Sequence, residues 1–128
     1  MINILLSSQK AMLEHSNASY LKQYIKKDSK IFVLGYSFFD SVVYDLKSWD
    51  IFYEKTQYLN ELNNIFTTFG VLKTNIFWCN YFTTSIDEIK KNLSLSDILF
   101  IPGGAPDQMI KRINEKKILD ILNQLLFY

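Results

Sequence analysis

The chain has 128 residues, 48% of them apolar and 16% aromatic, and a formal net charge of +1. This length supports one domain with a hydrophobic core, and the composition excludes an intrinsically disordered chain, which combines low hydrophobicity with high net charge. Because 14 basic residues nearly balance 13 acidic ones, the sequence predicts neither a nucleic-acid interface nor attachment to an anionic membrane. We interpret the two local basic clusters as solvated ends and faces of helices: Lys26, Lys27 and Lys30, and Lys111, Arg112, Lys116 and Lys117.

The cysteine content and the apolar stretches indicate the cellular compartment. Cys79 is the only cysteine, so no intramolecular disulfide can form, as is usual in a reducing cytoplasm. Residues 1–8 lack the basic region and the cleavage pattern of a signal peptide, and no apolar stretch approaches the roughly 20 residues that span a bilayer. We therefore expect a soluble, cytoplasmic protein with no membrane partner.

The first half of the chain is predicted to contain two buried strands, each followed by a helix. Short apolar runs rich in β-branched residues indicate strands over residues 2–7 and 30–37. Apolar side chains at helical spacing indicate helices over residues 18–27 and about 51–69, and Gly70 is suited to end the second helix in the left-handed conformation. The segment between the second strand and the second helix fits either a helical turn or an irregular loop.

The second half continues this alternation. Continuous apolar runs predict strands over residues 75–81 and 97–102. Between them, Ser85 and Glu88 form a capping-box pattern that starts a short helix. After the last strand, the apolar positions predict either one helix broken near Asn114 or two short helices.

An alternation of helices with strands that are apolar throughout is typical of a parallel sheet covered by helices on both faces. We therefore predict a single α/β domain over residues 1–128, with four parallel strands in the order 2-1-3-4. In that order, strand 2–7 lies between strands 30–37 and 75–81, and strand 97–102 lies at the edge beside strand 75–81. The crossovers between strands are expected to be right-handed.

Two glycines, Gly103 and Gly104, follow the fourth predicted strand directly and precede a helix start at Pro106. Ligands of open parallel sheets bind beyond the carboxyl ends of the strands, where glycines let backbone amides approach a developing negative charge. The same pair also suits a tight turn from strand to helix, and on the pair alone that structural explanation is favoured. The loop is not a phosphate-binding loop, because the spacing G-x-x-x-x-G-K-[ST] is absent.

Residues 97–113, DILFIPGGAPDQMIKRI, resemble the strand–Gly-Gly–helix segment of the dipeptidase E family of serine peptidases. The likeness is greatest to uncharacterised bacterial members that have Pro-Asp-x-Met after the glycines. Residues 2–8 are similar to the first strand of that family, and residues 30–39 and the helix before Gly70 occupy the places of its second strand and second helix. The resemblance covers the whole chain in the order of its elements, and it is specific in the segment around Gly103.

Membership of this family implies a flavodoxin-like three-layer sandwich similar to the class I glutamine amidotransferases, and hydrolysis of small peptides. It also implies a catalytic serine in a nucleophile elbow on the next strand, followed by a histidine and a carboxylate. In relatives the Gly-Gly loop supplies one amide of the oxyanion hole. That role would fall to Gly103 or Gly104 in this chain.

The sequence departs from the family pattern at two places. No fifth strand and no G-x-S-x-G-like elbow follow the helix that ends near Tyr128, and Ala105 and Pro106 stand where many members have a third glycine and then Asn-Thr. We therefore expect the N-terminal half of a dipeptidase E-like peptidase, truncated before the nucleophile, with no catalytic residue of its own and no activity as given. The alternative is a non-catalytic α/β module that self-associates.

Self-association is expected from the surfaces that such a chain leaves open. Strand 97–102 would have a free edge, and the last helix ends in four apolar or aromatic residues, 125–128. We therefore predict a homodimer or a higher oligomer that buries one of these two surfaces.

Structural roles explain the remaining reactive or aromatic side chains more simply than functional ones. Cys79 lies within a strand rather than in a glycine-flanked turn, so we interpret it as a small buried hydrophobic residue. His15 is interpreted as a surface residue near a helix start, and one histidine with one cysteine does not make a zinc site. We expect no metal and no cofactor. Turn capping or packing in a core or interface accounts for the other candidates: Ser7, Ser8, Trp49, Tyr53 and Tyr58.

Overall fold

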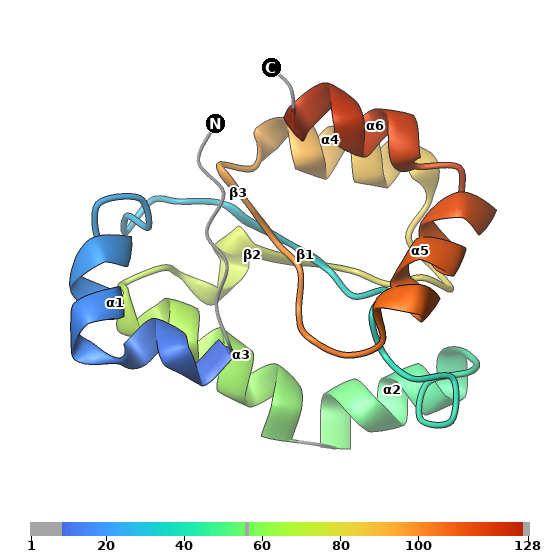
Figure 1. The fold of residues 1–128 in the computed structure, drawn as a ribbon, viewed down its shortest axis with the longest axis horizontal. Helices are drawn as coiled ribbons and strands as arrows, with labels where there is room; N and C mark the ends of the chain where they lie inside the picture. Colours follow the sequence, from blue (N-terminus) through green and yellow to red (C-terminus); the bar gives the residue numbers. More distant parts are fainter. Residues whose placement is uncertain (1–8, 56, 127–128) are drawn as a thin grey trace.

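The computed structural model describes residues 9–55 and 57–126 and shows an α/β fold built on a parallel sheet (Figure 1). Within these residues the sheet has three strands: β1 (Ile31–Leu34), β2 (Ile76–Cys79) and β3 (Ile98–Phe100). Each lies inside a predicted strand, and both pairings are parallel, as predicted. The predicted strand over residues 2–7 lies outside the described residues.

The order of the strands differs from the predicted one. β1 lies at the centre, in the order β2-β1-β3, with Ile31 beside Ile76 on one side and beside Ile98 on the other. The predicted order places this strand at the edge and the other two beside each other, and it is wrong on both points. In keeping with this central position, all four side chains of β1 are completely buried, whereas β3 and most of β2 are partly exposed. The predicted order is wrong because all three strands are apolar throughout, so their sequences do not indicate which of them pair.

Helices cover both faces of the sheet, because successive side chains of β1 point to opposite faces. Ile31 and Val33 pack against α1 and α3, and Phe32 and Leu34 pack against α4, α5 and α6. Figure 1 shows α1 and α3 on one side of the strands and α4 and α6 on the other. The bounds of these helices are α1 (His15–Leu21), α3 (Gln57–Thr68), α4 (Ile86–Leu95), α5 (Pro106–Glu115) and α6 (Leu119–Leu126).

The limits of several helices differ from the predicted ones. The single helix predicted over residues 51–69 is two helices, α2 (Leu46–Lys55) and α3, so the ambiguous segment before it is partly helical. The helix predicted over residues 18–27 begins and ends earlier, as α1. The last stretch forms two helices, which was one of the two predicted alternatives, and Lys117 between them has a φ of 55°. Two short 3-10 helices complete the fold: η1 (Gln9–Leu13) and η2 (Lys73–Asn75).

Two predicted helix ends are confirmed. The Glu88 amide donates a hydrogen bond to the Ser85 hydroxyl oxygen at 3.2 Å, and the Ser85 amide donates one to the Glu88 carboxylate at 2.8 Å, which completes the capping box of α4. Gly70 follows α3 with a φ of 89°, the left-handed conformation that glycine adopts without strain. Among the helices of residues 9–55 and 57–126, none has the length and apolar character needed to cross a membrane.

Candidate functional site

The loops after β1 and β3 are bonded to each other at the carboxyl edge of the sheet. The Ser37 hydroxyl donates a hydrogen bond to the Pro102 carbonyl oxygen at 2.7 Å, and the Ala105 amide donates one to the Ser37 carbonyl oxygen at 2.6 Å. Ser37 is only 3% exposed, so water does not compete for these bonds. We call Ser37 together with residues 102–105 the Gly-Gly junction. It lies where the strand order reverses, because β2 and β3 flank β1 on opposite sides, and ligands of open α/β sheets bind at such points.

The two glycines of the junction differ in whether the structure requires glycine at their position. Gly104 has a φ of 150°, and a β-carbon on it would overlap the Ser37 carbonyl oxygen, so no other residue fits without strain. Gly103 has open space where a β-carbon would lie. Both are exposed, and neither amide donates a hydrogen bond to another described residue. The tight-turn explanation therefore accounts for Gly104, whereas Gly103 and both amides are left accessible to a ligand.

Arg112 on α5 holds the loop after β1 in place. Its guanidinium donates hydrogen bonds to the carbonyl oxygens of Tyr36 at 3.0 Å, Phe38 at 2.7 Å and Val43 at 3.0 Å. It also donates one to the Asp40 carboxylate at 2.6 Å. Because Arg112 is only 5% exposed, its interpretation as a solvated helix residue is wrong. The neighbouring basic residues in the sequence do not indicate that this arginine is buried. Its four acceptors lie 69 to 76 residues away along the chain, so they could not be identified from the sequence.

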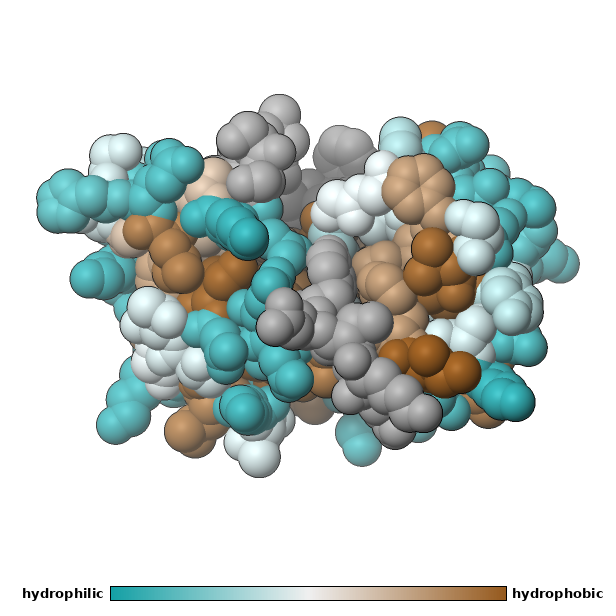
Figure 2. Space-filling model, turned by 90° about the horizontal axis from the view of Figure 1, so that it is seen from below, coloured by the Kyte–Doolittle hydropathy of each residue, from teal (hydrophilic) through white to brown (hydrophobic). Residues whose placement is uncertain are grey.

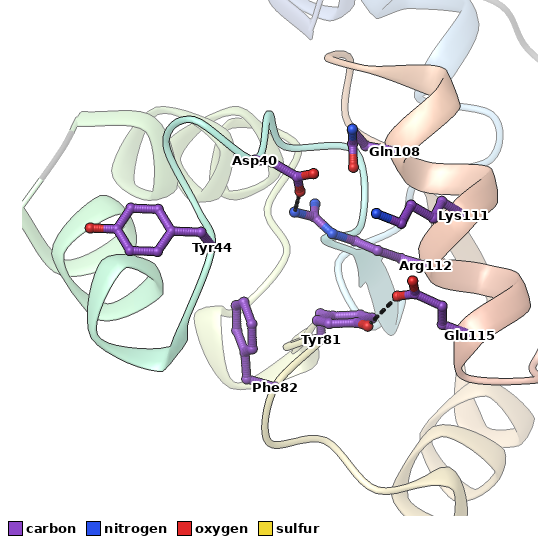
Figure 3. A pocket seen from close by; sticks show the side chains of 8 residues that line it. All are labelled: Asp40, Tyr44, Tyr81, Phe82, Gln108, Lys111, Arg112 and Glu115. Atoms are coloured by element: carbon purple, nitrogen blue, oxygen red, sulfur yellow. Dashed lines mark hydrogen bonds and ion pairs between the residues drawn. The ribbon is translucent and has the colours of Figure 1, made fainter.

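A pocket of about 280 Å³ opens beside this arginine (Figure 3). One wall is a polar face of α5, and the other consists of the loops after β1 and β2 and is mostly aromatic. The lining residues are Asp40, Tyr44, Tyr81, Phe82, Gln108, Lys111, Arg112 and Glu115. Figure 3 shows Lys111 and Arg112 reaching from α5 toward Asp40, with the ring of Tyr81 on the other side of the guanidinium.

Tyr81 connects the two walls of the pocket. Its hydroxyl donates a hydrogen bond to the Glu115 carboxylate at 2.6 Å. This bond raises the pKa of Tyr81 above its ordinary value, so the hydroxyl stays protonated and remains a donor. The centre of the ring lies 5.5 Å from the Arg112 guanidinium and 4.7 Å from the Lys116 ammonium, which adds cation–π attraction.

Two polar groups of the pocket have no partner among the described residues. The side-chain oxygen Oε1 of Gln108 is buried and accepts no hydrogen bond. Lys111 forms no ion pair with another described residue, although two carboxylates, those of Asp40 and Glu115, line the same pocket. Buried polar atoms are normally satisfied by protein, water or a ligand. Lys111 is exposed, so water solvates its ammonium, and the Gln108 oxygen is the group that marks where a ligand donor can be held.

The other candidate residues from the sequence lie away from this pocket. Cys79 is completely buried at the end of β2, and burial raises the pKa of its thiol to about 11. The thiol therefore stays protonated near neutral pH, in agreement with its interpretation as a buried hydrophobic residue rather than a nucleophile. His15 is the exposed first residue of α1, as predicted, and Trp49 packs in a small core with Phe38 and Val43. The remaining candidates lie outside the described side chains: Ser7, Ser8, Tyr53 and Tyr58.

Exposed apolar side chains gather on the loop after β1 and on α2. Phe39 is 56% exposed and Tyr44 is 67% exposed, and three further apolar residues here are more than 40% exposed: Val42, Leu46 and Ile51. Figure 2, which views the molecule from the side of α2 and α3, shows hydrophobic side chains in separate groups among hydrophilic ones. We call these five residues the α2 surface. The apolar surface predicted on the last helix, at residues 125–128, lies outside the described side chains.

The candidate site thus has a predicted part and an unpredicted part. The resemblance makes Gly103 or Gly104 the candidate oxyanion-hole residue, and the structure places both in the junction at the carboxyl edge of the sheet. Three pocket residues were not predicted, because they come together only where α5 packs against the loop after β1: Asp40, Gln108 and Lys111. The sequence matches no family model, and no similar protein was found among curated sequences or solved structures.

Proposed function

We propose that this chain forms the oxyanion-binding part of a serine hydrolase similar to dipeptidase E, which acts on small peptides. The Gly-Gly junction is the observation that carries the proposal. It presents the amides of Gly103 and Gly104 without partners among the described residues, on a loop whose shape is held by the two Ser37 hydrogen bonds. Fixed amide donors of this kind stabilise negative charge without having to reorganise.

The free outer edge of β3 supports the same proposal. Among the described residues β3 pairs with β1 alone, so a further parallel strand has room to pair beside β3, although the observed order β2-β1-β3 differs from the order that the resemblance implies for these strands. A further strand beside β3 would have its carboxyl end next to the Gly-Gly junction. A nucleophile elbow at the end of that strand, as in the amidotransferase-like peptidases that the sequence resembles, would then face the two free amides.

In the proposed reaction the junction acts on the tetrahedral intermediate. Attack on a peptide carbonyl places negative charge on its oxygen, and removal of one oxyanion donor lowers kcat by about 10²–10³-fold in hydrolases. The nucleophile and its base must come from outside the described residues. Within these residues, His15 forms no hydrogen bond to a serine, threonine or cysteine, and such a pairing is what activates a nucleophile.

Hydrolysis assays on two proteins test this proposal: the 128-residue chain, and the product of any longer in-frame reading frame that contains it. We expect the 128-residue chain to leave dipeptides intact, and the longer product to hydrolyse them and to react with a fluorophosphonate at a serine. In the longer product, Gly103→Pro removes an amide donor and should lower kcat by about 10²-fold, whereas Gly103→Ala keeps the amide and should have little effect.

Two outcomes would count against the hydrolase. One is turnover by the 128-residue chain that disappears in Cys79→Ala or His15→Ala. The other is a longer product that carries no fluorophosphonate-reactive serine. A stop codon directly after the codon for Tyr128 would instead favour the second candidate function.

That second candidate is a non-catalytic module that self-associates. β3 pairs with β1 along one edge, and its other edge has no partner strand among residues 9–55 and 57–126. The α2 surface adds exposed apolar area on the same molecule. Free strand edges and apolar patches favour contacts between chains. Light scattering at micromolar concentration should therefore report a homodimer or a larger oligomer, and a monomer would contradict this candidate.

A further inference from the structure

The pocket beside Arg112 offers a ligand both kinds of charge. Arg112 is already engaged, because both terminal nitrogens of its guanidinium donate hydrogen bonds, which go to three carbonyl oxygens and to Asp40. Lys111 keeps a free ammonium, and Asp40 uses only one of its two carboxylate oxygens in the described contacts. The lining side chains carry two positive and two negative formal charges in all. A ligand with one charge of each sign matches this pocket better than an anion or a cation does.

The Gln108 side chain adds a requirement for a hydrogen-bond donor. Its oxygen Oε1 is buried without a partner, and burial of an unsatisfied acceptor is unfavourable by itself. Oε1 lies on α5 in the same wall as Lys111, opposite the loop that carries Asp40 (Figure 3). A ligand ammonium between Gln108 and Asp40 would satisfy the orphaned oxygen and pair with the carboxylate.

The size and the aromatic wall of the pocket define the rest of the ligand. A volume of about 280 Å³ lies just below the range of roughly 300–1,000 Å³ that drug-sized ligands occupy, so it suits a small metabolite. Tyr81 and Phe82 form a wall against which an aromatic or apolar group can pack, whereas the Tyr44 ring points away from them (Figure 3). A small zwitterion with such a side chain combines all of these properties.

We propose that this pocket binds a free amino acid with an aromatic or large apolar side chain. The ammonium lies between Asp40 and the Gln108 oxygen, the carboxylate pairs with Lys111, and the side chain packs on Tyr81 and Phe82. The site is separate from the Gly-Gly junction and does not depend on the hydrolase proposal, since binding requires no nucleophile.

Titration of the 15N-labelled chain with L-phenylalanine, followed by amide chemical shifts, tests this site. Saturable shifts are expected at Asp40, Tyr81 and the first two turns of α5. L-Phenylalaninamide keeps the ammonium and lacks the carboxylate, and N-acetyl-L-phenylalanine keeps the carboxylate and lacks the ammonium. Both should bind more weakly than L-phenylalanine, by about fivefold or more, because each loses one charge-assisted contact.

Variants assign the contacts to residues. Lys111→Gln should weaken L-phenylalanine binding by about fivefold and leave L-phenylalaninamide binding unchanged, because the pairing with Lys111 needs the carboxylate. Gln108→Leu should weaken both ligands, since it removes the acceptor for the ammonium. Lys90→Gln, which changes an exposed lysine on α4, is the matched control and should change neither affinity. The dispersed amide spectrum of each variant verifies that it is folded.

Several results would overturn the site. These are the absence of saturable shifts at millimolar L-phenylalanine, shifts confined to residues outside the pocket, or equal affinity for the N-acetylated compound. A Lys111→Gln effect of the same size on L-phenylalaninamide would also refute the assigned orientation. Hydrolysis is not a readout in any of these measurements, so the failure of this site and the failure of the hydrolase can be distinguished.

Discussion

The Gly-Gly junction and the pocket share the loop after β1, but they differ in whether their polar groups have hydrogen-bond partners. In the junction, the Ser37 hydroxyl and carbonyl oxygen are buried and bonded, and Gly104 leaves no space for a side chain. In the pocket, Lys111 and the Gln108 oxygen have no partner among the described residues. Arg112 borders both parts, and like the junction groups it is buried and hydrogen-bonded. Substitutions of the junction residues and of Arg112 should therefore lower the stability of the fold. Substitutions of Lys111 and Gln108 should weaken ligand binding with little loss of stability.

Replacement of Arg112 should have the largest effect on stability. Arg112→Met keeps much of the apolar stem but leaves three carbonyl oxygens without their donor, which should lower the free energy of unfolding by about 3–4 kcal/mol. Urea denaturation followed by circular dichroism measures this change. Lys111→Met, at the next position of the same helix, is the control and should stay within about 0.5 kcal/mol of the wild type. Similar values for the two variants would mean that the Arg112 bonds do not hold the loop.

Alanine at the two glycines should separate their roles. Gly104→Ala forces a side chain into a backbone conformation with a φ of 150° and against the Ser37 carbonyl oxygen, so a loss of about 2–3 kcal/mol is expected. Gly103→Ala meets open space and should change the unfolding free energy by no more than about 0.5 kcal/mol. The same urea titrations measure both. If Gly104→Ala is as stable as Gly103→Ala, the junction is not as closely packed as described.

Removal of the Asp40 charge should have a smaller effect. The Asp40 side chain is 50% exposed, so solvent screens its ion pair with Arg112, and Asp40→Asn should cost only about 0.5–1 kcal/mol. Asp50→Asn on α2, where the side chain is exposed and has no ion pair with a described residue, is the matched control. Unfolding midpoints at low salt and at about 0.5 M NaCl should converge for Asp40→Asn and the wild type, because salt screens the pair. A loss of several kcal/mol would place Asp40 with the junction rather than with the pocket.

Gln108→Leu should have the smallest effect on stability, and it is the substitution that could increase stability. It removes a buried oxygen that has no hydrogen-bond partner, so stability should change by no more than about 0.5 kcal/mol or should increase. Gln124→Leu on α6, which changes an exposed glutamine, controls for the helix propensity of leucine. Thermal unfolding of both variants gives the comparison. A clear destabilisation in Gln108→Leu alone would show that the glutamine oxygen is satisfied in solution.

The sequence was sufficient to locate the three described strands and the start of α4, but not to determine which strands lie beside each other. Continuous apolar runs located β1, β2 and β3, and the pattern at Ser85 and Glu88 located the start of α4, because these signals are local. The position of β1 at the centre of the sheet depends on which strands pair, and an apolar run does not encode its partner. The predicted order was therefore wrong, although the parallel sheet was right.

The same distinction separates the two parts of the candidate site. Gly103 and Gly104 could be found from the sequence because a glycine pair after a strand is a local signal. Arg112 could not, because its surroundings are a basic stretch of helix while its acceptors belong to the loop after β1. The pocket likewise depends on α5 packing beside two loops that are distant in sequence.

The wide separation of the contacts that hold the junction has a consequence for the lifetime of the folded state. The Ser37–Pro102 bond joins residues 65 positions apart, and the bond from Arg112 to Tyr36 joins residues 76 positions apart. We predict that these polar contacts form after the folding transition state, once the strands and helices that carry them have packed. Variants that lose them should unfold faster but fold at nearly the wild-type rate, so that only the unfolding limb of a chevron plot shifts. The junction would then determine how long the protein resists proteolysis, independently of any ligand that it binds.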